Sequence, residues 1–579
     1  MCSHQSKIWL VGILGVHCAL MAYTAAWTSP TFDEPSHLAA GLYVWRTGQC
    51  DLYAVNPPLV KVVAAIPVLV TGFNENWLRV RRPPARTEMN VGIDFVAANQ
   101  SRILWMTTLA RWACIPFCVL GGAVCYIWSN RLFGSPCGWI ALLLWCFSPT
   151  ILGNGAVISA DVASASVGVL ACYLFWRWLD EPTWERAMVN GLGLGICWLV
   201  KLTWVILPFI WILVWLAYRI SDDKPRQTLG RGLLQIGVST FVAILLLNVG
   251  YAFEGSLTQL GDYQFTSGVL GGVPSHQGDR LRGNRFRDTL VGSIPVPVPS
   301  SFVYGLDAQK QDFEESRMLY FAGHRSHSGW WYFYPLSVLL KEPLGTLLLG
   351  LIALLSFFRT PRWWATAMRQ CAVWIPPLVV LLLVSSNSRL NYYRYLTPTL
   401  PFAFVWISQI GQRLPDSAAF RGFLYSSLSI SVMAGLASVP HSLSFVNVLG
   451  GGTTAGHYWF ADCNFDWGQD LPALREWIRR HPEVEQLHVA YFGMVHPLSA
   501  GIEFRDLPPE LINRALRITE YRIPAGWYAI SVSHLRGIEG HVHNSNGGIN
   551  TVQDAGLTVF ESETPIDRAG PSILIFHIQ

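Results

Sequence analysis

A series of apolar stretches, each about as long as a bilayer is thick, constrains this chain more than any other feature. A helix needs roughly 20 apolar residues to cross a membrane, and charged residues make up only 13% of this sequence, against about 25% in soluble globular domains. We therefore predict a polytopic α-helical membrane protein with about 11 transmembrane helices. The expected spans are 8–28, 103–128, 137–154, 157–179, 187–200, 202–219, 232–252, 332–358, 371–386, 391–411 and 422–440.

The short connections between these spans indicate the orientation. Their basic residues fall on one side of the membrane, among them Arg131, Arg186, Arg219, Arg359 and Arg413. Cytoplasmic loops carry such an excess of Lys and Arg, so this side and the amino terminus are expected in the cytoplasm. An odd number of spans then places the carboxy-terminal residues outside. The sequence thus predicts a multi-pass protein of the cell (inner) membrane.

Two regions are expected. Residues 1–440 form the transmembrane module, with external loops at about 29–101 and 253–331, and residues 441–579 form a small external (periplasmic-side) α/β domain. In that domain the hydrophobic pattern predicts a helix over Leu471–Arg480. It predicts strands over Leu487–Phe492, Trp527–Val532, Leu557–Phe560 and Ile573–Ile578.

The composition excludes some classes of partner and cofactor. The net charge of +4 comes without a basic run, so nucleic acid is not an expected partner. No Cys or His spacing is typical of a zinc site, and no metal ligand is assigned. Cys50 and Cys463 fall in external segments, and their position alone leaves a disulfide between them open.

Two adjacent carboxylates, Asp33 and Glu34, stand where the first span leaves the membrane. A capping box between Thr31 and Glu34 explains these carboxylates as well as a catalytic role does. Asp161 stands near the external start of the fourth span and has the same two explanations. His37 follows Asp33 by one helical turn, so both side chains can face one cavity.

Cations are expected near the same membrane face. Lys341 lies in the external half of the eighth span, and Arg389 and Arg394 open the tenth. Ionisable residues at such depths are costly and are candidates for function, although a lysine that reaches for the headgroups explains Lys341 equally well. Carboxylates with cations suit transfer of a group from a membrane-embedded phosphate donor, because a carboxylate takes the acceptor's proton while a cation stabilises the departing phosphate.

Several motifs occur in one order along the chain, and together they resemble a known family. They are Phe32 to Gly41 (FDEPSHLAAG), Asn56 to Leu59 (NPPL), Ser159 to Val162 (SADV), Gly329 to Pro335 (GWWYFYP), Leu340 to Leu344 (LKEPL), Tyr393 to Pro398 (YRYLTP) and Asn464 to Leu471 (NFDWGQDL). The combination resembles GT-C fold glycosyltransferases of the protein O-mannosyltransferase and aminoarabinose transferase-like group (family 39-like), which use polyprenyl-phosphate-linked sugars.

The resemblance implies an inverting glycosyltransferase that acts on the non-cytoplasmic face. Asp33 is then the expected general base, with Glu34 and Asp161 as supporting acidic residues. The residues expected to bind the substrate or its phosphate are His37, Lys61, Lys341, Arg389, Tyr393 and Arg394. Asn56 replaces a histidine of the family motif, or the glutamate of the aminoarabinose transferases, so a divalent metal cofactor is left open. Lys61 is the expected substitute for a lysine missing beside Pro57.

Two other functions compete with this hypothesis. A transporter or flippase of a lipid-linked or anionic solute would also need charges within the membrane, but at midplane sites with access from both sides. A non-catalytic assembly factor would use the carboxylates only as helix caps. The expected partners are a polyprenyl-phosphate-sugar donor, membrane lipid and an acceptor that is a protein, a lipid or a glycan. The identity of the sugar and of the acceptor stays open.

Overall fold

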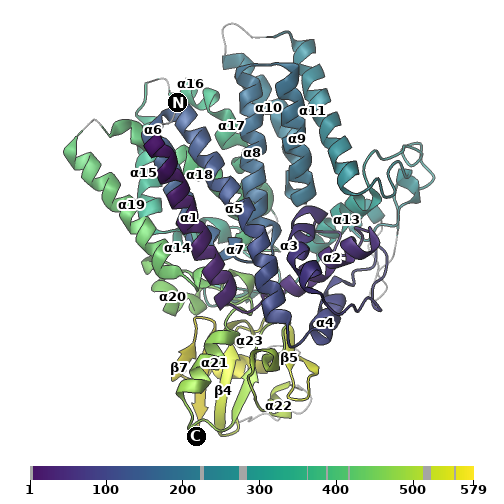
Figure 1. Ribbon diagram of the computed structural model, residues 1–579, viewed down its shortest axis with the longest axis vertical. Helices are drawn as coiled ribbons and strands as arrows, with labels where there is room; N and C mark the ends of the chain where they lie inside the picture. Colours follow the sequence, from purple (N-terminus) through teal and green to yellow (C-terminus); the bar gives the residue numbers. More distant parts are fainter. Residues whose placement is uncertain are drawn as a thin grey trace.

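The computed structural model describes residues 4–221, 227–272, 283–361, 363–386, 389–414, 417–512, 523–552 and 556–579. A bundle of long helices makes up most of the molecule, and a small α/β domain lies at one end of it (Figure 1). The amino-terminal end of α1 lies at the opposite end of the bundle from this domain. The described chain is thus a polytopic helical membrane protein with a carboxy-terminal α/β region.

Five helical segments in the described chain are long and apolar enough to cross a bilayer. They are α1 (His4–Trp27), α5 (Ile103–Phe133), α8 (Ala160–Asp180), α11 (Leu229–Gly250) and the run Leu202–Ile220, in which the 3-10 helix η1 (Leu202–Ile206) leads into α10 (Leu207–Ser221). Three bent helix pairs raise the number to at most eight. The count by length and composition is therefore smaller than the expected 11.

The bent pairs explain part of this difference. They are α6 (Ser135–Cys146) with α7 (Pro149–Gly155), bent by 54°, α14 (Phe333–Lys341) with α15 (Leu344–Phe358), bent by 118°, and α16 (Trp363–Arg369) with α17 (Cys371–Ser386), bent by 82°. The span expected over 332–358 thus consists of two helices with a sharp bend between them, not of one continuous helix. Proline lacks the N–H that continues a helix, and Pro343 stands at the sharpest of these breaks.

Three expected spans are not among these eight. Residues 391–411 hold the 3-10 helix η3 (Tyr393–Thr399), α18 (Leu400–Ile407) and the start of η4 (Ser408–Arg413), instead of one continuous helix. Pro398 lies within η3, where a tighter helix replaces regular α-helical bonding. The spans expected over 187–200 and 422–440 correspond to α9 (Trp184–Val200) and α19 (Ala418–Ser438).

The segments expected outside the membrane gather at the end of the bundle near the α/β domain (Figure 1). They contain α2 (Glu34–Thr47), α3 (Pro58–Thr71), α4 (Glu88–Ala98) and α13 (Ser300–Glu314). Shorter elements in this region are η2 (Leu260–Asp262), α12 (Gly268–Gly271), β1 (Leu319–Phe321) and β2 (His324–Ser326). The apolar run around Leu59 to Leu69 forms α3, which is too short to cross the membrane.

The carboxy-terminal region is built on a four-stranded sheet with strand order β3-β4-β8-β7. Its strands are β3 (Leu487–Ala490), β4 (Gly526–Ser531), β7 (Asp567–Ala569) and β8 (Ile573–Ile578). β3 and β4 are parallel, whereas β8 runs antiparallel to β4 and to β7. A separate hairpin joins β5 (Gly540–His543) to β6 (Ile549–Val552).

Helices and turns complete this region. They are η5 (Ser442–Ser444), η6 (Val448–Gly450), α20 (Gly452–Ala455), η7 (Gly456–Tyr458), η8 (Asp462–Asn464), α21 (Leu471–Arg480), η9 (Pro497–Ala500), α22 (Pro509–Ile512), α23 (Val532–Leu535) and η11 (Gly556–Ser562). The helix predicted over Leu471–Arg480 is confirmed, as are three of the four predicted strands. The strand predicted over Leu557–Phe560 is wrong, because those residues lie in η11, where Leu557 and Phe560 are fully buried.

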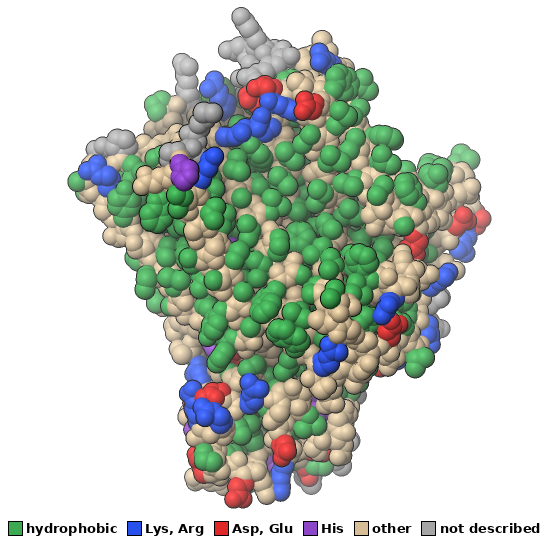
Figure 2. All heavy atoms as spheres, viewed as in Figure 1, with side chains coloured by type: hydrophobic (Ala, Val, Ile, Leu, Met, Phe, Trp, Pro, Cys, Tyr) green, Lys and Arg blue, Asp and Glu red, His purple; other side chains and the backbone are tan. Residues whose placement is uncertain are grey.

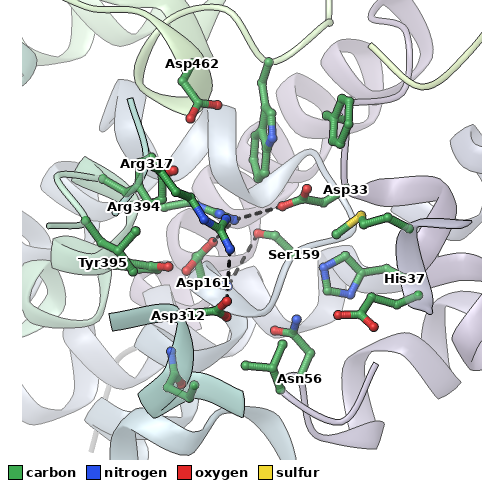
Figure 3. A pocket seen from close by; sticks show the side chains of 18 of the residues that line it. Asp33, His37, Asn56, Ser159, Asp161, Asp312, Arg317, Arg394, Tyr395 and Asp462 are labelled. Atoms are coloured by element: carbon green, nitrogen blue, oxygen red, sulfur yellow. Dashed lines mark hydrogen bonds and ion pairs between the residues drawn. The ribbon is translucent and has the colours of Figure 1, made fainter. Parts of the chain in front are cut away.

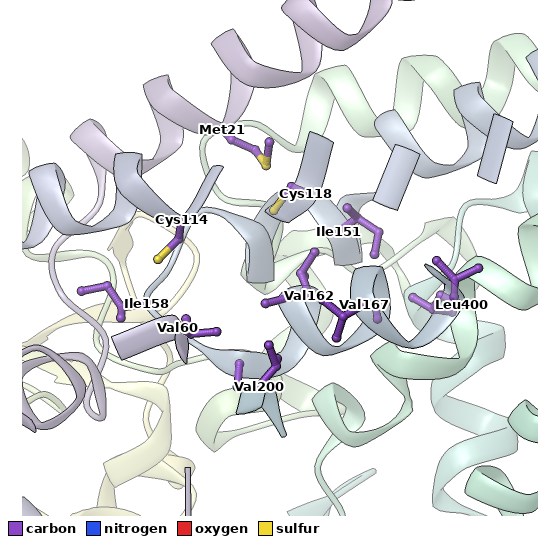
Figure 4. Close-up of a cluster of buried hydrophobic side chains, with 14 of the residues drawn as sticks. Met21, Val60, Cys114, Cys118, Ile151, Ile158, Val162, Val167, Val200 and Leu400 are labelled. Atoms are coloured by element: carbon purple, nitrogen blue, oxygen red, sulfur yellow. The ribbon is translucent and has the colours of Figure 1, made fainter. Parts of the chain in front are cut away.

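Apolar packing holds the bundle together around α8. Figure 4 shows Val162 and Val167 of this helix among side chains from α1, α3, α5, α7, α9 and α18. A broad belt of hydrophobic side chains covers the middle of the face drawn in Figure 2, and charged side chains gather toward its two ends. Such a belt is typical of a surface that contacts lipid.

Candidate active site

A cavity of 460 Å³ opens between the helix bundle and the carboxy-terminal region. Its lining residues come from six places in the chain: the start of α2, the loops before α3 and α4, the start of α8, Lys201 between α9 and η1, the region from α13 to η3, and the carboxy-terminal segment. Of the residues predicted to act at the site, Asp33, His37, Asp161 and Arg394 line it. Figure 3 shows Asp33 and Asp161 on either side of the Arg394 guanidinium.

Asp33 is the N-cap residue of α2, and its carboxylate faces Arg394 across the cavity. The distance from Arg394 Nη1 to Asp33 Oδ2 is 3.4 Å. Burial raises the pKa of Asp33, and the nearby carboxylates of Asp462 and Asp161 raise it further, while Arg394 opposes this shift. Asp33 is thus a carboxylate with an increased affinity for a proton, held next to a permanent cation.

Three aromatic rings surround the Arg394 guanidinium. It stacks over Trp467 at 4.6 Å from the ring centroid, and lies 5.5 Å and 5.6 Å from the centroids of Tyr392 and Tyr395. Such contacts stabilise a cation at a fixed place. The buried Nε of Arg394 has no hydrogen-bond partner in the described part of the chain, and both ion pairs of this side chain run through Nη1.

Asp161 forms an ion pair with Lys201, a residue between α9 and η1. The second oxygen of Asp161 lies 3.9 Å from Arg394 Nη1. The Ser159 hydroxyl accepts a long hydrogen bond of 3.4 Å from the Asp161 N–H, and Ser159 is the N-cap residue of α8. Ser159 therefore caps the helix, and Asp161 still has its place in the cavity.

His37 lines the cavity one turn after Asp33, as the spacing predicts. Its ring lies 4.6 Å from that of Tyr53, centroid to centroid. Burial, with a smaller contribution from Lys61 and Arg394, lowers the pKa of His37 to about 3. At neutral pH the imidazole is therefore uncharged and contributes hydrogen bonds to the cavity instead of charge.

Glu34 lies next to Asp33 in sequence but does not line the cavity. Its side chain and that of Arg111 are each only 1% exposed, and they form an ion pair through both carboxylate oxygens. Glu34 also accepts hydrogen bonds from the backbone and side chain of Thr31, at 2.7 and 3.0 Å. Asp33 is the N-cap residue and Glu34 the first residue of α2, so the capping box expected between Thr31 and Glu34 is not formed. With both oxygens engaged in this way, Glu34 supports the fold of the loop.

Four of the residues expected to bind substrate also lie away from the cavity. Lys61 Nζ donates to the carbonyl oxygens of Leu52 and Tyr53, and Lys341 Nζ donates to that of Leu443. The Arg389 side chain is exposed and donates to the Glu314 carbonyl at 2.6 Å. The Tyr393 hydroxyl donates to Glu342 at 2.7 Å. Each of these four side chains thus has a hydrogen-bond partner within the protein, either a backbone carbonyl or a neighbouring side chain.

The structure adds charged residues that the sequence argument missed. Lys201, Arg317, Asp312 and Asp462 all line the cavity, together with Arg86, Glu88, Glu315 and Glu539. Asp312 accepts hydrogen bonds from Arg86 at 2.6 Å and from Arg317 at 3.1 Å. Lys201 carried a usable signal, because a single lysine between two apolar stretches is a costly residue. Asp312 and Arg317 carried none, since they stand in an ordinary polar stretch of sequence at the end of α13 and just after it.

Neither a metal site nor a disulfide is formed by the described residues. No three His, Cys, Asp or Glu side chains within the described ranges are grouped to hold a metal ion. Cys50 and Cys463 are both free thiols, so the disulfide that the sequence left open is not formed. Cys463 directly follows Asp462, which lines the cavity. Cys50 is not next to a cavity-lining residue in the sequence, and its backbone N–H donates to the Glu254 carboxylate.

The fold and the cavity together define a multi-pass membrane protein with an ion-paired pocket between its helix bundle and a carboxy-terminal α/β region. No family model and no curated protein matches the sequence. ArnT from Cupriavidus metallidurans bound to undecaprenyl phosphate is a similar solved structure, with 12% identity, a TM-score of 0.45 and 98% of each chain covered. AglB, the oligosaccharyltransferase from Archaeoglobus fulgidus, in complex with an inhibitory peptide and a dolichol-phosphate, has 10% identity and a TM-score of 0.44, over 98% of this chain and 76% of that one. These values are too low to assign an activity.

Proposed function

We propose that the protein is an integral-membrane glycosyltransferase that moves a sugar from a polyprenyl-phosphate donor to an acceptor on the non-cytoplasmic face. The observation that carries this proposal is the pair formed by Asp33 and Arg394, 3.4 Å apart in the cavity. A proton acceptor and a permanent cation at one place are the two groups that such a transfer needs. The motif resemblance of the sequence points to the same chemistry.

The reaction follows from these groups. Asp33 takes the proton of the acceptor's hydroxyl group while the hydroxyl oxygen attacks the anomeric carbon of the donor sugar. The bond between that carbon and the phosphate oxygen breaks, and the polyprenyl phosphate leaves with the electron pair. Arg394 and Lys201 stabilise the charge that develops on this phosphate. Attack opposite the leaving group inverts the anomeric configuration.

Arg394 fits the phosphate role for two reasons. Its guanidinium can bind two phosphate oxygens at once, and its own ion pairs with Asp33 and Asp161 are long, at 3.4 and 3.9 Å. The Trp467 ring keeps the guanidinium in place. The Asp161 carboxylate lies between Lys201 and Arg394, so it orients both cations before the donor binds.

A test of the proposal compares Asp33→Asn with wild type in membranes that contain a panel of polyprenyl-phosphate donors with radiolabelled sugars. We expect label transfer to fall by at least about 100-fold, because an amide cannot accept the proton. Asp94→Asn is the matched control, since Asp94 pairs with Arg79 on the outside of the molecule. Near-wild-type transfer by Asp33→Asn would contradict the assignment of the base.

The same material separates the transferase from the transporter or flippase. A transferase moves label from donor to a new protein, lipid or glycan fraction. A flippase moves the intact donor across sealed vesicles and leaves its sugar–phosphate bond unbroken. Movement of donor without cleavage by wild-type protein would therefore favour the flippase.

A further inference from the structure

Asp462 brings a carboxylate into the cavity from the carboxy-terminal segment, after the last helix of the bundle. It is the first residue of η8, and Figure 3 shows its side chain near Arg394 and Arg317, across the cavity from Asn56. Trp467, five residues later, stacks over Arg394. One wall of the cavity therefore belongs to the carboxy-terminal segment.

The backbone holds Asp462 in an uncommon conformation. Its φ angle is +53°, in the left-handed region. The Asp462 N–H donates to the Ser533 hydroxyl at 3.0 Å, and its carbonyl accepts from the N–H groups of Phe465 and Asp466, each at 2.8 Å. The Cys463 N–H donates to Asp462 Oδ1 at 2.6 Å. A residue kept in such a conformation by its surroundings is often a functional one.

The charges of the cavity are unbalanced near this wall. Seven carboxylates and four cations line it: Asp33, Glu88, Asp161, Asp312, Glu315, Asp462 and Glu539 against Arg86, Lys201, Arg317 and Arg394. Ion pairs account for the first five carboxylates. Within the described residues, no ion pair involves Asp462 or Glu539. The surplus of negative charge thus lies on the carboxy-terminal side.

We propose that Asp462 binds the acceptor, by accepting a hydrogen bond from a hydroxyl group next to the one that reacts. The acceptor is then a neutral, hydroxyl-bearing group, not an anionic one. This inference rests on the proposed transferase function. Once a donor phosphate occupies Arg394, the cavity is more negative still, and a carboxylate held there gains from hydrogen-bond donors and repels anions.

The proposal gives a physical reason for the electrostatic coupling between Asp462 and Asp33. The charge of Asp462 raises the pKa of Asp33 across the cavity. A hydroxyl-bearing acceptor between them satisfies both carboxylates: one of its hydroxyls loses its proton to Asp33, and a neighbouring hydroxyl donates to Asp462. Donor and acceptor are therefore held by different parts of the chain.

The test uses Asp462→Asn in the full-length protein. Asparagine keeps an oxygen for the Cys463 N–H and tolerates a positive φ, so the turn is preserved while the charge is removed. Two rates are measured with the polyprenyl-phosphate sugar that wild type turns over: transfer of label to the acceptor fraction of membrane vesicles, and release of free sugar by purified protein without acceptor. We expect transfer to fall by about tenfold or more and hydrolysis to change less than about twofold.

Two further variants sharpen the result. Asp462→Gly removes the carboxylate but suits the positive φ, and should repeat the selective loss of transfer. Asp567→Asn is the matched control, since Asp567 lies on the edge strand β7, accepts from Trp477 and does not line the cavity; it should leave both rates unchanged.

Three outcomes are decisive. Selective loss of transfer supports the proposal. Unchanged transfer, or equal loss of transfer and hydrolysis by the folded Asp462→Asn protein, overturns it, since the second result assigns Asp462 to the donor or to the base. Wild-type protein that turns over no polyprenyl-phosphate sugar at all would instead refute the transferase function itself.

Discussion

Arg111 lies within a predicted span, yet its guanidinium reaches the loop that leads from α1 to α2. It donates to the carbonyl oxygens of Ala25, Thr28 and Ser29 as well as to Glu34. Glu34 in turn accepts the Ile158 N–H at 2.6 Å, three residues before Asp161. A single buried ion pair therefore ties the loop that carries Asp33 to the loop that carries Asp161.

Replacement of Arg111 tests this connection. We expect Arg111→Lys to lower the thermal unfolding midpoint in detergent strongly, because lysine cannot pair with Glu34 through two parallel hydrogen bonds and leaves buried carbonyls unpaired. Removal of one partner of a buried ion pair costs about 3–5 kcal/mol. Arg79→Lys, at an exposed pair, should cost less than about 1 kcal/mol. Equal midpoints for the two variants would argue against the role of Arg111.

The pH dependence of transfer should report Asp33. In the proposed reaction Asp33 acts only when ionised, so transfer should fall as the pH is lowered through its pKa. Burial and the charges of Asp462 and Asp161 raise this pKa above its ordinary 3.8, against Arg394 and Arg317. Asp462→Asn removes one of the raising charges. The acid limb of its pH–rate profile should therefore move to lower pH. A limb that stays in place would show that the two carboxylates are not coupled.

At the residue scale, the sequence predicts part of the cavity. The hydropathy pattern shows which ionisable residues lie at the ends of spans, where burying a charge is unfavourable. This signal points to Asp33, His37, Asp161 and Arg394. Lys61 and Lys341 carry the same signal, but the structure turns their ammonium groups toward backbone carbonyls. Hydropathy gives the depth of a charge and not its direction, so it cannot separate these cases.

At the scale of elements, close contact between α2 and α3 positions the start of α2. Gly41 of α2 faces the backbone of α3, and a Cβ at this position would lie 1.9 Å from the Lys61 carbonyl oxygen. No side chain fits there without a shift of one helix. Asp33 and His37 lie at the amino-terminal end of the same helix, so such a shift would reach the cavity.

Gly41→Ala tests this packing. We expect a lower unfolding midpoint, with a cost of about 1–3 kcal/mol from overpacking, and a slower transfer reaction. Gly237→Ala in α11 is the matched control, because nothing lies within 4 Å of a Cβ there. That variant should be unchanged or more stable by about 0.5–1 kcal/mol, since alanine is the better helix former. A Gly41→Ala protein as stable and active as this control would contradict the prediction.

The sequence predicts the kinds of elements better than their continuity. Long apolar stretches did become helices, but the stretch over 332–358 bends by 118° and the stretch over 391–411 begins as a 3-10 helix. Composition cannot show where a helix turns within a bundle, since bent and straight helices bury the same kinds of side chain. Proline at 343 and 398 was the available signal. In the α/β region, η11 buries its apolar residues as a strand would.

At the scale of the whole molecule, the structure groups segments that the charge rule assigned to one side of the membrane. The loops around α2 and α13 and the carboxy-terminal region lie at one end, and the start of α1 lies at the other (Figure 1). The orientation of this arrangement in the membrane stays a prediction of the basic residues in the short loops.

Labelling in intact cells tests that orientation. A membrane-impermeant maleimide should label Glu485→Cys, an exposed residue of the carboxy-terminal region, and should not label Arg359→Cys until the cells are opened. The background is low, because among the described cysteines Cys18 is half-buried and the others are buried. The reverse labelling pattern would invert the predicted topology and place the cavity on the cytoplasmic side.

The wall formed by Asp462 and Trp467 has a consequence for how the protein is made. Translation delivers Asp33 first and this wall only after every helix of the bundle has been synthesised. Until the late segment has folded, Arg394 lacks its contact with the Trp467 ring and the pocket lacks a side. A half-inserted chain therefore holds no complete pocket, and the proposed transfer reaction cannot begin before the carboxy-terminal segment has been synthesised and folded.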